Sequence, residues 1–412
     1  MKFSKLRQLF LVSSIGLLVA TMMTACQLVS IDYVYVASSG GSTAGSNGQI
    51  DVYAADASSG ALRTEVAPVS SGGIAPIALA VSPNYLNLYA ANQGTSNNVV
   101  HFTIADDGSL TPKETTTGFG TPVGIAVNQA GTYLFTAVQQ GTGAALAINP
   151  LGSDGTVSTV SVAPAVLVVP GHSGDTIVPT GVTALANNKA VYVTAYDKSA
   201  YNPGCTPTPT CTPSGAKPGW VFGFSVGSGG TLTPLSGSPY EAGVEPRALV
   251  ADPTSRFLYA VDFASSQMIG YTIMSDSNLV FFLAVPTKVG NQPNAITFDP
   301  RGKFVYVSNA LDSTVSAFVI DLSTGAPSLT ATPVAGLINP TDTEPVGLVV
   351  DPSLGRFLYT ANYLGNSVSG FRLDPTSGVL TATQNTPYPS SANPTAITAI
   401  PHGNHEVEST TP

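Results

Sequence analysis

The sequence has 412 residues, of which 43% are hydrophobic and only 9% are charged. The 15 Lys and Arg residues are outnumbered by 24 Asp and Glu, and the resulting net charge of −9 excludes the basic surface that nucleic-acid binding requires. The length alone would allow two or three domains, but strong internal repetition favours a single repetitive body.

The N-terminus has the pattern of an export signal. Three cations lie near the start, at Lys2, Lys5 and Arg7. The apolar stretch that follows, over residues 9–23, is too short for a lasting membrane span. We therefore expect residues 1–25 to be a signal peptide rather than part of the fold.

Cys26 follows the small residues of Met-Thr-Ala, a pattern that resembles the lipobox of bacterial lipoproteins. The resemblance implies that Cys26 is lipidated and that residues 26–32 form a short tether. The alternative is an ordinary secretory signal followed by a chance cysteine. Gln27 after the cysteine favours the outer membrane by analogy with proteobacterial sorting. We expect a lipid-anchored protein of the bacterial cell envelope, on the periplasmic or the surface side.

A short phrase occurs seven times along the chain: a proline, two or three residues, and an apolar run that often ends near Asp-Pro or Asn. The copies begin at Pro76, Pro122, Pro179, Pro246, Pro293, Pro345 and Pro394. Their spacing of 46 to 67 residues is typical of β-propeller blades. Seven copies predict seven blades.

A second strand pattern, rich in aromatic and β-branched residues, recurs equally often. It occupies residues 33–38, 85–92, 132–138, 190–195, 256–262, 303–309 and 356–362. A third alternating strand, a turn containing Asp and Gly, and a polar fourth strand follow each copy. The repeats predict an all-β, seven-bladed propeller over residues 33–401, with four antiparallel strands, a to d, in each blade.

The order of the strands predicts how the ring closes. The chain starts with a strand b at Tyr33 and ends with a strand a from Pro394, so the last strand should complete the blade that strands b to d begin. Closure removes open sheet edges. Residues 402–412 are expected to form a disordered tail. The b–c and d–a loops share one face, the top, and the tether should enter from the bottom, which would face the membrane.

Long insertions gather on the top of the fourth blade. One contains His172, and the other, over residues 197–219, contains Cys205 and Cys211. In an oxidising compartment these two cysteines predict a loop disulfide. Two thiols without a nearby histidine make a poor zinc site, so no metal or cofactor is expected. Such loops either recognise a partner or are insertions that the fold tolerates and that have no function.

The residues beside the strand-a prolines should ring the top of the central channel. Polar members occur in blades five to seven: Glu245, Arg247, Gln292, Asn294 and Glu344. Converging polar groups at a channel mouth are typical of a small-ligand site, and the alternative is a surface ion pair of little consequence. Asp262 joins the ligand-binding candidates. However, other blades have Asn at the equivalent position at the end of strand b, and this repetition indicates that the residue caps a turn.

The phrases Y-V-S-N, Y-T-A-N and Y-A-A-N, with D-x-x-x-G-x-L turns, resemble the YVTN-type propellers. Over residues 33–401 the chain looks like the seven-bladed lactonase family, which includes a 6-phosphogluconolactonase. That family's proposed catalytic pattern has P-R-H on one strand a and Y-x-x-N-E on the following strand b. In this chain the segments read P-R-A-L and Y-A-V-D-F. The resemblance implies that Arg247 binds an anionic group, while Ala248 and Phe263 replace the family's His and Glu.

The sequence leaves two functions open. The first is a lactonase-like hydrolase of a sugar lactone at the top-face channel mouth, with Arg247 as the anion-binding group and His172 or Glu245 as the base. The second is a non-catalytic envelope scaffold that binds a glycan or a protein through its top loops. In both, the protein is a monomer that meets the membrane through its lipid anchor and binds no nucleic acid.

Overall fold

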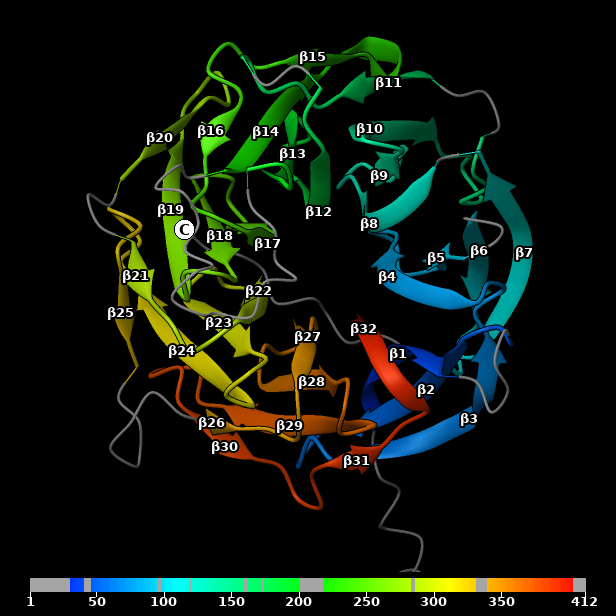
Figure 1. The fold of residues 1–412 in the computed structure, drawn as a ribbon. Helices are drawn as coiled ribbons and strands as arrows, with labels where there is room; N and C mark the ends of the chain where they lie inside the picture. Colours follow the sequence, from blue (N-terminus) through cyan, green and yellow to red (C-terminus); the bar gives the residue numbers. More distant parts are fainter. Residues whose placement is uncertain are drawn as a thin grey trace, which may run out of the picture.

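The computed structural model describes residues 30–40, 46–94, 98–118, 120–158, 162–171, 174–200, 218–282, 286–330 and 339–402. These residues form seven antiparallel sheets arranged as a ring around one axis (Figure 1). The predicted all-β, seven-bladed propeller is confirmed. The helical content of the described part is a single 3-10 turn, η1 (Ser228–Gly230), and no helix in these ranges has the length and hydropathy to cross a membrane.

Blades 1 to 3 contain four strands each, which follow one another in the order a to d. Blade 1 comprises β32 (Ala392–Pro401), β1 (Ser30–Gly40), β2 (Gln49–Asp56) and β3 (Leu62–Ser70). Blade 2 comprises β4 (Ala75–Val81), β5 (Asn87–Gln93), β6 (Asn98–Ile104) and β7 (Leu110–Thr117). Blade 3 comprises β8 (Thr121–Val127), β9 (Tyr133–Gln140), β10 (Gly143–Pro150) and β11 (Val162–Val166).

In blades 4 to 7 the outer strand is divided into two short segments that pair with opposite ends of strand c. Blade 4 comprises β12 (Ile177–Ala184), β13 (Ala190–Asp197), β14 (Gly219–Val226), β15 (Leu232–Pro234) and β16 (Tyr240–Glu241). Blade 5 comprises β17 (Pro246–Ala251), β18 (Phe257–Asp262), β19 (Gln267–Ile273), β20 (Leu279–Phe281) and β21 (Thr287–Lys288). Blade 6 comprises β22 (Pro293–Phe298), β23 (Phe304–Asn309), β24 (Thr314–Ile320), β25 (Pro327–Leu329) and β26 (Asn339–Pro340). Blade 7 comprises β27 (Pro345–Val350), β28 (Phe357–Asn362), β29 (Ser367–Leu373), β30 (Leu380–Ala382) and β31 (Tyr388–Pro389).

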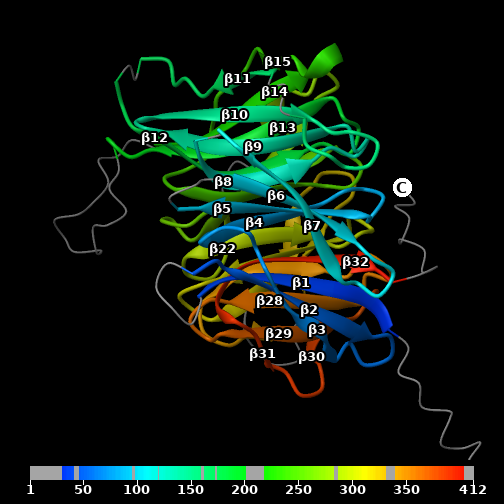
Figure 2. The same cartoon turned by 90° about the vertical axis from the view of Figure 1, so that its right-hand side faces the viewer.

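The ring closes as the sequence predicts, by pairing of β1 with β32. The register runs from Asp32 opposite Pro401 to Gly40 opposite Ala392. The start of β1 and the end of β32 therefore lie together on one face of the ring (Figure 2). His402 continues this pairing, because its backbone N–H donates a 2.7 Å hydrogen bond to the Ile31 carbonyl.

The polar residue that ends the apolar run of strand a caps the a–b turn on the bottom face. The Asp299 carboxylate accepts 2.7 Å hydrogen bonds from the backbone N–H groups of Lys303 and Phe304. Asp252, Asp351 and Asn128 make the equivalent contacts in their own blades. A short acceptor that bonds its own turn explains why the phrase so often ends in Asp or Asn.

A tyrosine in strand b joins each blade to the next in six of the seven blades. Its hydroxyl donates to a backbone carbonyl in the c–d turn of the following blade, and this carbonyl belongs to a glycine in every case except Tyr192, which bonds Ser277. The donors are Tyr35, Tyr89, Tyr192, Tyr259, Tyr306 and Tyr359. In blade 3 the equivalent side chain is Phe135, which has no hydroxyl and packs in an apolar cluster with blade 4.

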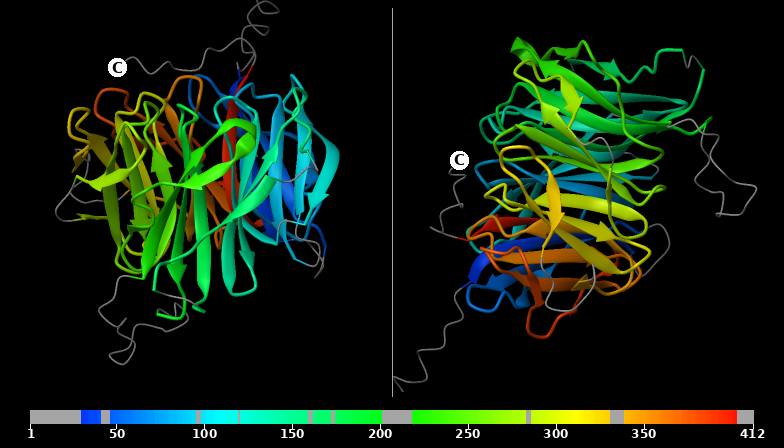
Figure 3. Two further views of the ribbon diagram at one scale, coloured as in Figure 1. Left: turned by 90° about the horizontal axis from the view of Figure 1, so that it is seen from above. Right: turned by 90° about the vertical axis from the view of Figure 1, so that its left-hand side faces the viewer.

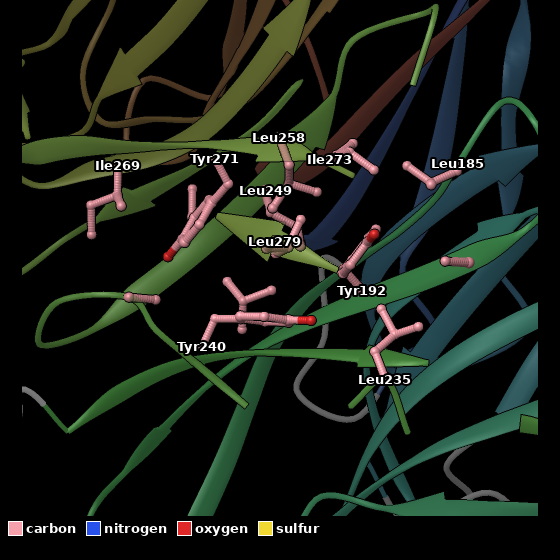
Figure 4. Close-up of a cluster of buried hydrophobic side chains, with 14 residues drawn as sticks. Leu185, Tyr192, Leu235, Tyr240, Leu249, Leu258, Ile269, Tyr271, Ile273 and Leu279 are labelled. Atoms are coloured by element: carbon pink, nitrogen blue, oxygen red, sulfur yellow. The ribbon is translucent and has the colours of Figure 1, made fainter. Parts of the chain in front are cut away.

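Apolar clusters between neighbouring blades form the core, and the strands run from one face of the ring to the other (Figure 3). The cluster shared by blades 4 and 5 contains Tyr192, Tyr240, Leu249 and Tyr271, all at most 9% exposed (Figure 4). Because each sheet is covered by its two neighbours, the innermost strands can be almost continuously apolar. This rigid wall positions the residues at the axis.

Candidate functional site at the channel mouth

A cavity of about 620 Å³ lies on the propeller axis and is lined by the first half of every strand a. In blades 2 to 7 the strand pairing shifts register between the proline and the second residue after it. The residue directly after the proline is therefore the extra residue of a β-bulge, which re-aims its side chain. These residues form the first ring of the cavity, together with Thr395 of blade 1: Ile77, Val123, Thr180, Arg247, Asn294 and Val346.

The next position along each strand a is alanine or glycine in all seven blades. This second ring consists of Ala78, Gly124, Gly181, Ala248, Ala295, Gly347 and Ala396. A Cβ atom on Gly181 would lie 3.1 Å from the Arg247 carbonyl oxygen, so little space is left between neighbouring inner strands. Below it, a third ring of larger apolar residues, including Leu79, Ile125 and Leu249, lines the deeper part of the cavity.

The polar side chains of the cavity that are not bonded to a neighbouring inner strand are concentrated on one side. Arg247, Asn294 and Glu344 come from the consecutive blades 5, 6 and 7. The opposite side, from blades 2 and 3, presents Ile77 and Val123. The cavity therefore has a polar wall and an apolar wall, and its deeper lining is apolar.

Two threonines of the first ring join neighbouring inner strands. The Thr180 hydroxyl donates a 2.6 Å hydrogen bond to the Pro246 carbonyl, and the Thr395 hydroxyl donates a 2.7 Å bond to the Pro76 carbonyl. The Gln93 amide similarly donates to the Pro122 carbonyl at 2.8 Å. These three side chains hold the inner strands together, and they leave Arg247, Asn294 and Glu344 as the main groups that face a ligand.

Arg247 is the single cation among the described residues that line the cavity. It forms an ion pair with Glu245, whose side chain is fully buried, whereas the Arg247 side chain is 35% exposed. The guanidinium also lies over the Phe263 ring, 4.6 Å from its centroid. The carboxylate and the ring fix the orientation of the guanidinium and leave its remaining surface toward the cavity.

The backbone of Glu245 is held by Asp262. The Asp262 carboxylate accepts 2.9 Å hydrogen bonds from the N–H groups of Val244 and Glu245, and a 3.0 Å bond from the Gln267 amide. Asp262 is buried and does not line the cavity. Asn309 and Asn362, at the equivalent positions, span their own b–c turns by donating amide hydrogen bonds to the hydroxyl groups of Thr314 and Ser367. Asp262 thus acts as a turn cap that positions the Glu245–Arg247 segment.

Glu344 and two tyrosines complete the polar wall. Glu344 is half-buried, and burial raises the pKa of its carboxyl group. Its carbonyl accepts a 2.8 Å hydrogen bond from the Tyr363 N–H, which holds the two residues side by side. The pKa of Tyr196 is also raised, first by burial and then by the Glu245 charge, while Arg247 acts in the opposite direction. The Glu344 carboxylate is the acidic group best placed to exchange a proton with a ligand.

The structure brings together three of the predicted site residues, Arg247, Asn294 and Glu344. Glu245 lies behind Arg247, and Gln292, in a left-handed conformation with φ of 53°, lies outside the lining. His172, Cys26, Cys205 and Cys211 fall outside the described residues. Sequence reasoning missed Tyr196 and Tyr363, although each lies one residue beyond the end of a predicted strand b.

No group of three or more His, Cys, Asp or Glu side chains in the described ranges is arranged to hold a metal ion. The described residues that line the cavity supply one guanidinium, one accessible carboxylate, and amide, hydroxyl and phenol groups. Such a set can orient a carbonyl group and activate a water molecule.

Family comparison agrees with this architecture. The model of the family described as "Lactonase, 7-bladed beta-propeller" matches residues 34–168 and 224–405. The chain belongs to this lactonase family. Residues 169–223, between the two matched parts, contain β12 and β13 of blade 4, which contribute Thr180 and Tyr196 to the cavity.

Solved structures show the same fold as this lactonase-family chain. A proposed 6-phosphogluconolactonase from Bacteroides fragilis has a TM-score of 0.71 at 18% identity, covering 91% of this chain and 99% of its own. The periplasmic gluconolactonase of Pseudomonas aeruginosa has a TM-score of 0.66 at 20% identity, covering 90% and 99%. Among curated proteins, none matches the sequence. At these identities the likeness establishes the fold, and the activity has to be argued from the cavity.

Proposed function

We propose that this lactonase-family propeller binds a small sugar lactone in the axial cavity and hydrolyses it. The observation that carries the proposal is the placement of Arg247, Asn294 and Glu344 on three consecutive blades, all facing one cavity. Family membership and the similarity to lactonase-type structures support the same chemistry. We assign the base to Glu344 rather than to Glu245, because the Glu245 side chain is fully buried in an ion pair. The other predicted base, His172, lies outside the described residues.

In this proposal Arg247 and Glu344 have separate roles in ester hydrolysis. The lactone carbonyl oxygen lies toward the Arg247 guanidinium, which stabilises the negative charge that develops on that oxygen. Glu344 removes a proton from a water molecule as the water attacks the carbonyl carbon. The tetrahedral intermediate collapses with cleavage of the ring C–O bond, and the leaving alkoxide takes up the proton. The product is a hydroxy acid.

A second function, a non-catalytic scaffold for a glycan or a protein, is favoured by one specific observation. The positions of the family's His and Glu are Ala248 and Phe263. The Phe263 ring stacks on Arg247 and carries no ionisable group, so it offers no means of proton transfer. On this hypothesis the cavity and the top loops bind sugar without cleaving it.

Hydrolysis of a panel of lactones by the purified protein distinguishes the two functions. We expect turnover of at least one sugar lactone, and a loss of about tenfold or more in kcat/KM for Arg247→Ala. Arg372→Ala is the matched control, because this exposed arginine lies on β29 outside the cavity lining. Absence of turnover on every lactone, with glycan or protein capture retained, would establish the scaffold instead.

We also propose that the protein is anchored to the cell envelope through Cys26 and acts as a monomer. The start of β1 lies on the bottom face, at the Asp32–Pro401 end of the closure, whereas the cavity is lined by Thr395 and its neighbours at the other end of β32. An anchor at the N-terminus would therefore leave the mouth of the cavity facing away from the membrane. Incorporation of a radiolabelled fatty acid that is lost in Cys26→Ala tests the anchor. Elution as a dimer would contradict the monomer.

A further inference from the structure

The charges around the cavity indicate which kind of lactone it accepts, an inference that rests on the proposed function. One cation, Arg247, faces the cavity from the described part of the chain. Its charge is matched by the fully buried Glu245, with which it forms an ion pair. Glu344 adds a second negative charge to the same wall. Arg247 and Glu344 face the cavity and Glu245 lies directly behind Arg247, so the three groups together carry one excess negative charge.

We infer that the cavity selects an uncharged sugar lactone and discriminates against a phosphorylated one. A phosphate group carries nearly two negative charges at neutral pH and is bound in proteins by several cations or by unshared N–H donors. A phosphate bound in this cavity would meet a single guanidinium that is already paired with Glu245, and it would face the Glu344 carboxylate. Repulsion between like charges at cavity dimensions is large enough to dominate selectivity.

The shape of the cavity fits an uncharged sugar ring. The oxygen atoms of such a ring can face Arg247, Asn294 and Glu344 on the polar wall. Its C–H face can pack against Ile77 and Val123 on the opposite wall. Tyr363, held beside Glu344 through its backbone N–H, also lines the cavity at this edge. A cavity with one polar and one apolar wall thus matches the two faces of a sugar ring.

The same charges would favour release of the product. Hydrolysis converts an uncharged lactone into a hydroxy acid, which ionises at neutral pH and carries a negative charge. The new carboxylate lies in a cavity whose wall already holds an excess negative charge. Repulsion therefore acts on the product and not on the substrate.

Binding of two stable lactam analogues tests the inference. D-Gluconolactam and its 6-phosphate differ only in the phosphate group and are not hydrolysed like lactones. At pH 8 and low salt, calorimetry with the full-length protein should show that the uncharged lactam binds about tenfold more tightly or better. Binding of the 6-phosphate should strengthen as salt increases, because salt screens repulsion.

A variant that removes the charge of Glu344 tests whether this residue causes the discrimination against phosphate. Glu344→Gln should improve binding of the 6-phosphate about tenfold and change binding of the uncharged lactam much less. Glu241→Gln, at an exposed carboxylate outside the cavity lining, should leave the ratio of the two affinities unchanged. Tighter binding of the 6-phosphate, weakening as salt increases, would overturn the inference and leave the proposed function intact. If neither lactam binds, both are wrong.

Discussion

The Tyr359 hydroxyl donates a 2.8 Å hydrogen bond to the Gly60 carbonyl, and this bond links the last complete blade to the blade that closes the ring. Both groups are buried, although 299 positions separate them in the chain. The contact repeats the tyrosine bonds that join other neighbouring blades, such as Tyr306 to Gly378. The blades that meet at the closure are therefore joined by the same type of hydrogen bond as other neighbouring blades.

Tyr359→Phe should lower the free energy of unfolding by about 1–3 kcal/mol, because it leaves the buried Gly60 carbonyl without its donor. Urea denaturation followed by fluorescence measures the change. Tyr306→Phe, which removes the equivalent bond between blades 6 and 7, should have a similar effect. An unchanged midpoint in both variants would contradict the role of these bonds.

Removal of residues 392–412 should abolish the closed ring. The deletion takes away β32 and exposes the pairing edge of β1, which is paired along Asp32 to Gly40 in the intact protein. We expect self-association in size-exclusion chromatography with light scattering, together with loss of a cooperative thermal transition. Removal of residues 403–412 alone is the control and should preserve the monomer. A monomeric 392–412 deletion that melts like the parent would disprove closure by β32.

The ring could be predicted from the sequence because its determinants are local and repeated. The proline phrase marks strand a and the aromatic phrase marks strand b. Because the chain begins with a strand b and ends with a strand a, the closure can also be predicted. Arg247 was identifiable because it interrupts a row of small and apolar residues beside those prolines. Asn294 and Glu344 were identifiable for the same reason.

The detailed geometry of the site could not be predicted, because it depends on contacts between blades. Glu245 and Arg247 are two positions apart, yet one is buried and the other lines the cavity, since a bulge lies between Pro246 and Ala248. Tyr196 reaches the cavity from blade 4, and its role depends on the neighbouring blade rather than on its own sequence context. Likewise, the sequence carries no evident signal for the divided outer strands in blades 4 to 7.

Asp299→Ala should destabilise the protein by about 2 kcal/mol. The change removes the acceptor of two backbone N–H groups, of which Phe304 N–H is buried, and it also removes the 2.8 Å contact with Arg301. Thermal unfolding measures the loss. Asp321→Ala is the comparison, because Asp321 caps an exposed c–d turn through Ser323 and Thr324. A loss at Asp321 equal to that at Asp299 would show that burial of the cap is unimportant.

Asp32 should make the stability of the ring depend on pH. Burial, followed by the charge of Asp351, raises the pKa of the Asp32 carboxyl from 3.8 to about 8. Between about pH 4 and pH 8 the folded protein keeps a proton that the unfolded chain has released. Stability should therefore fall as pH rises through this window, by up to about 1.4 kcal/mol per pH unit, and level off above pH 8.

Denaturation at a series of pH values, with wild type compared with Asp32→Asn, isolates this contribution because other titrating groups are common to both proteins. The variant cannot ionise at position 32, so it should gain stability over wild type as pH increases from 4 to 8. Asp374→Asn provides a control. Hydrogen bonds from the backbone N–H groups of Ser377 and Thr376 lower the pKa of Asp374, so its contribution is lost only as pH falls below about 4, and its difference from wild type should stay nearly constant from about pH 5 to pH 8. If the difference in free energy of unfolding between wild type and Asp32→Asn stays constant over this range, Asp32 is ionised in the folded ring. Ser353 and the surrounding strands would then stabilise a carboxylate beside Asp351.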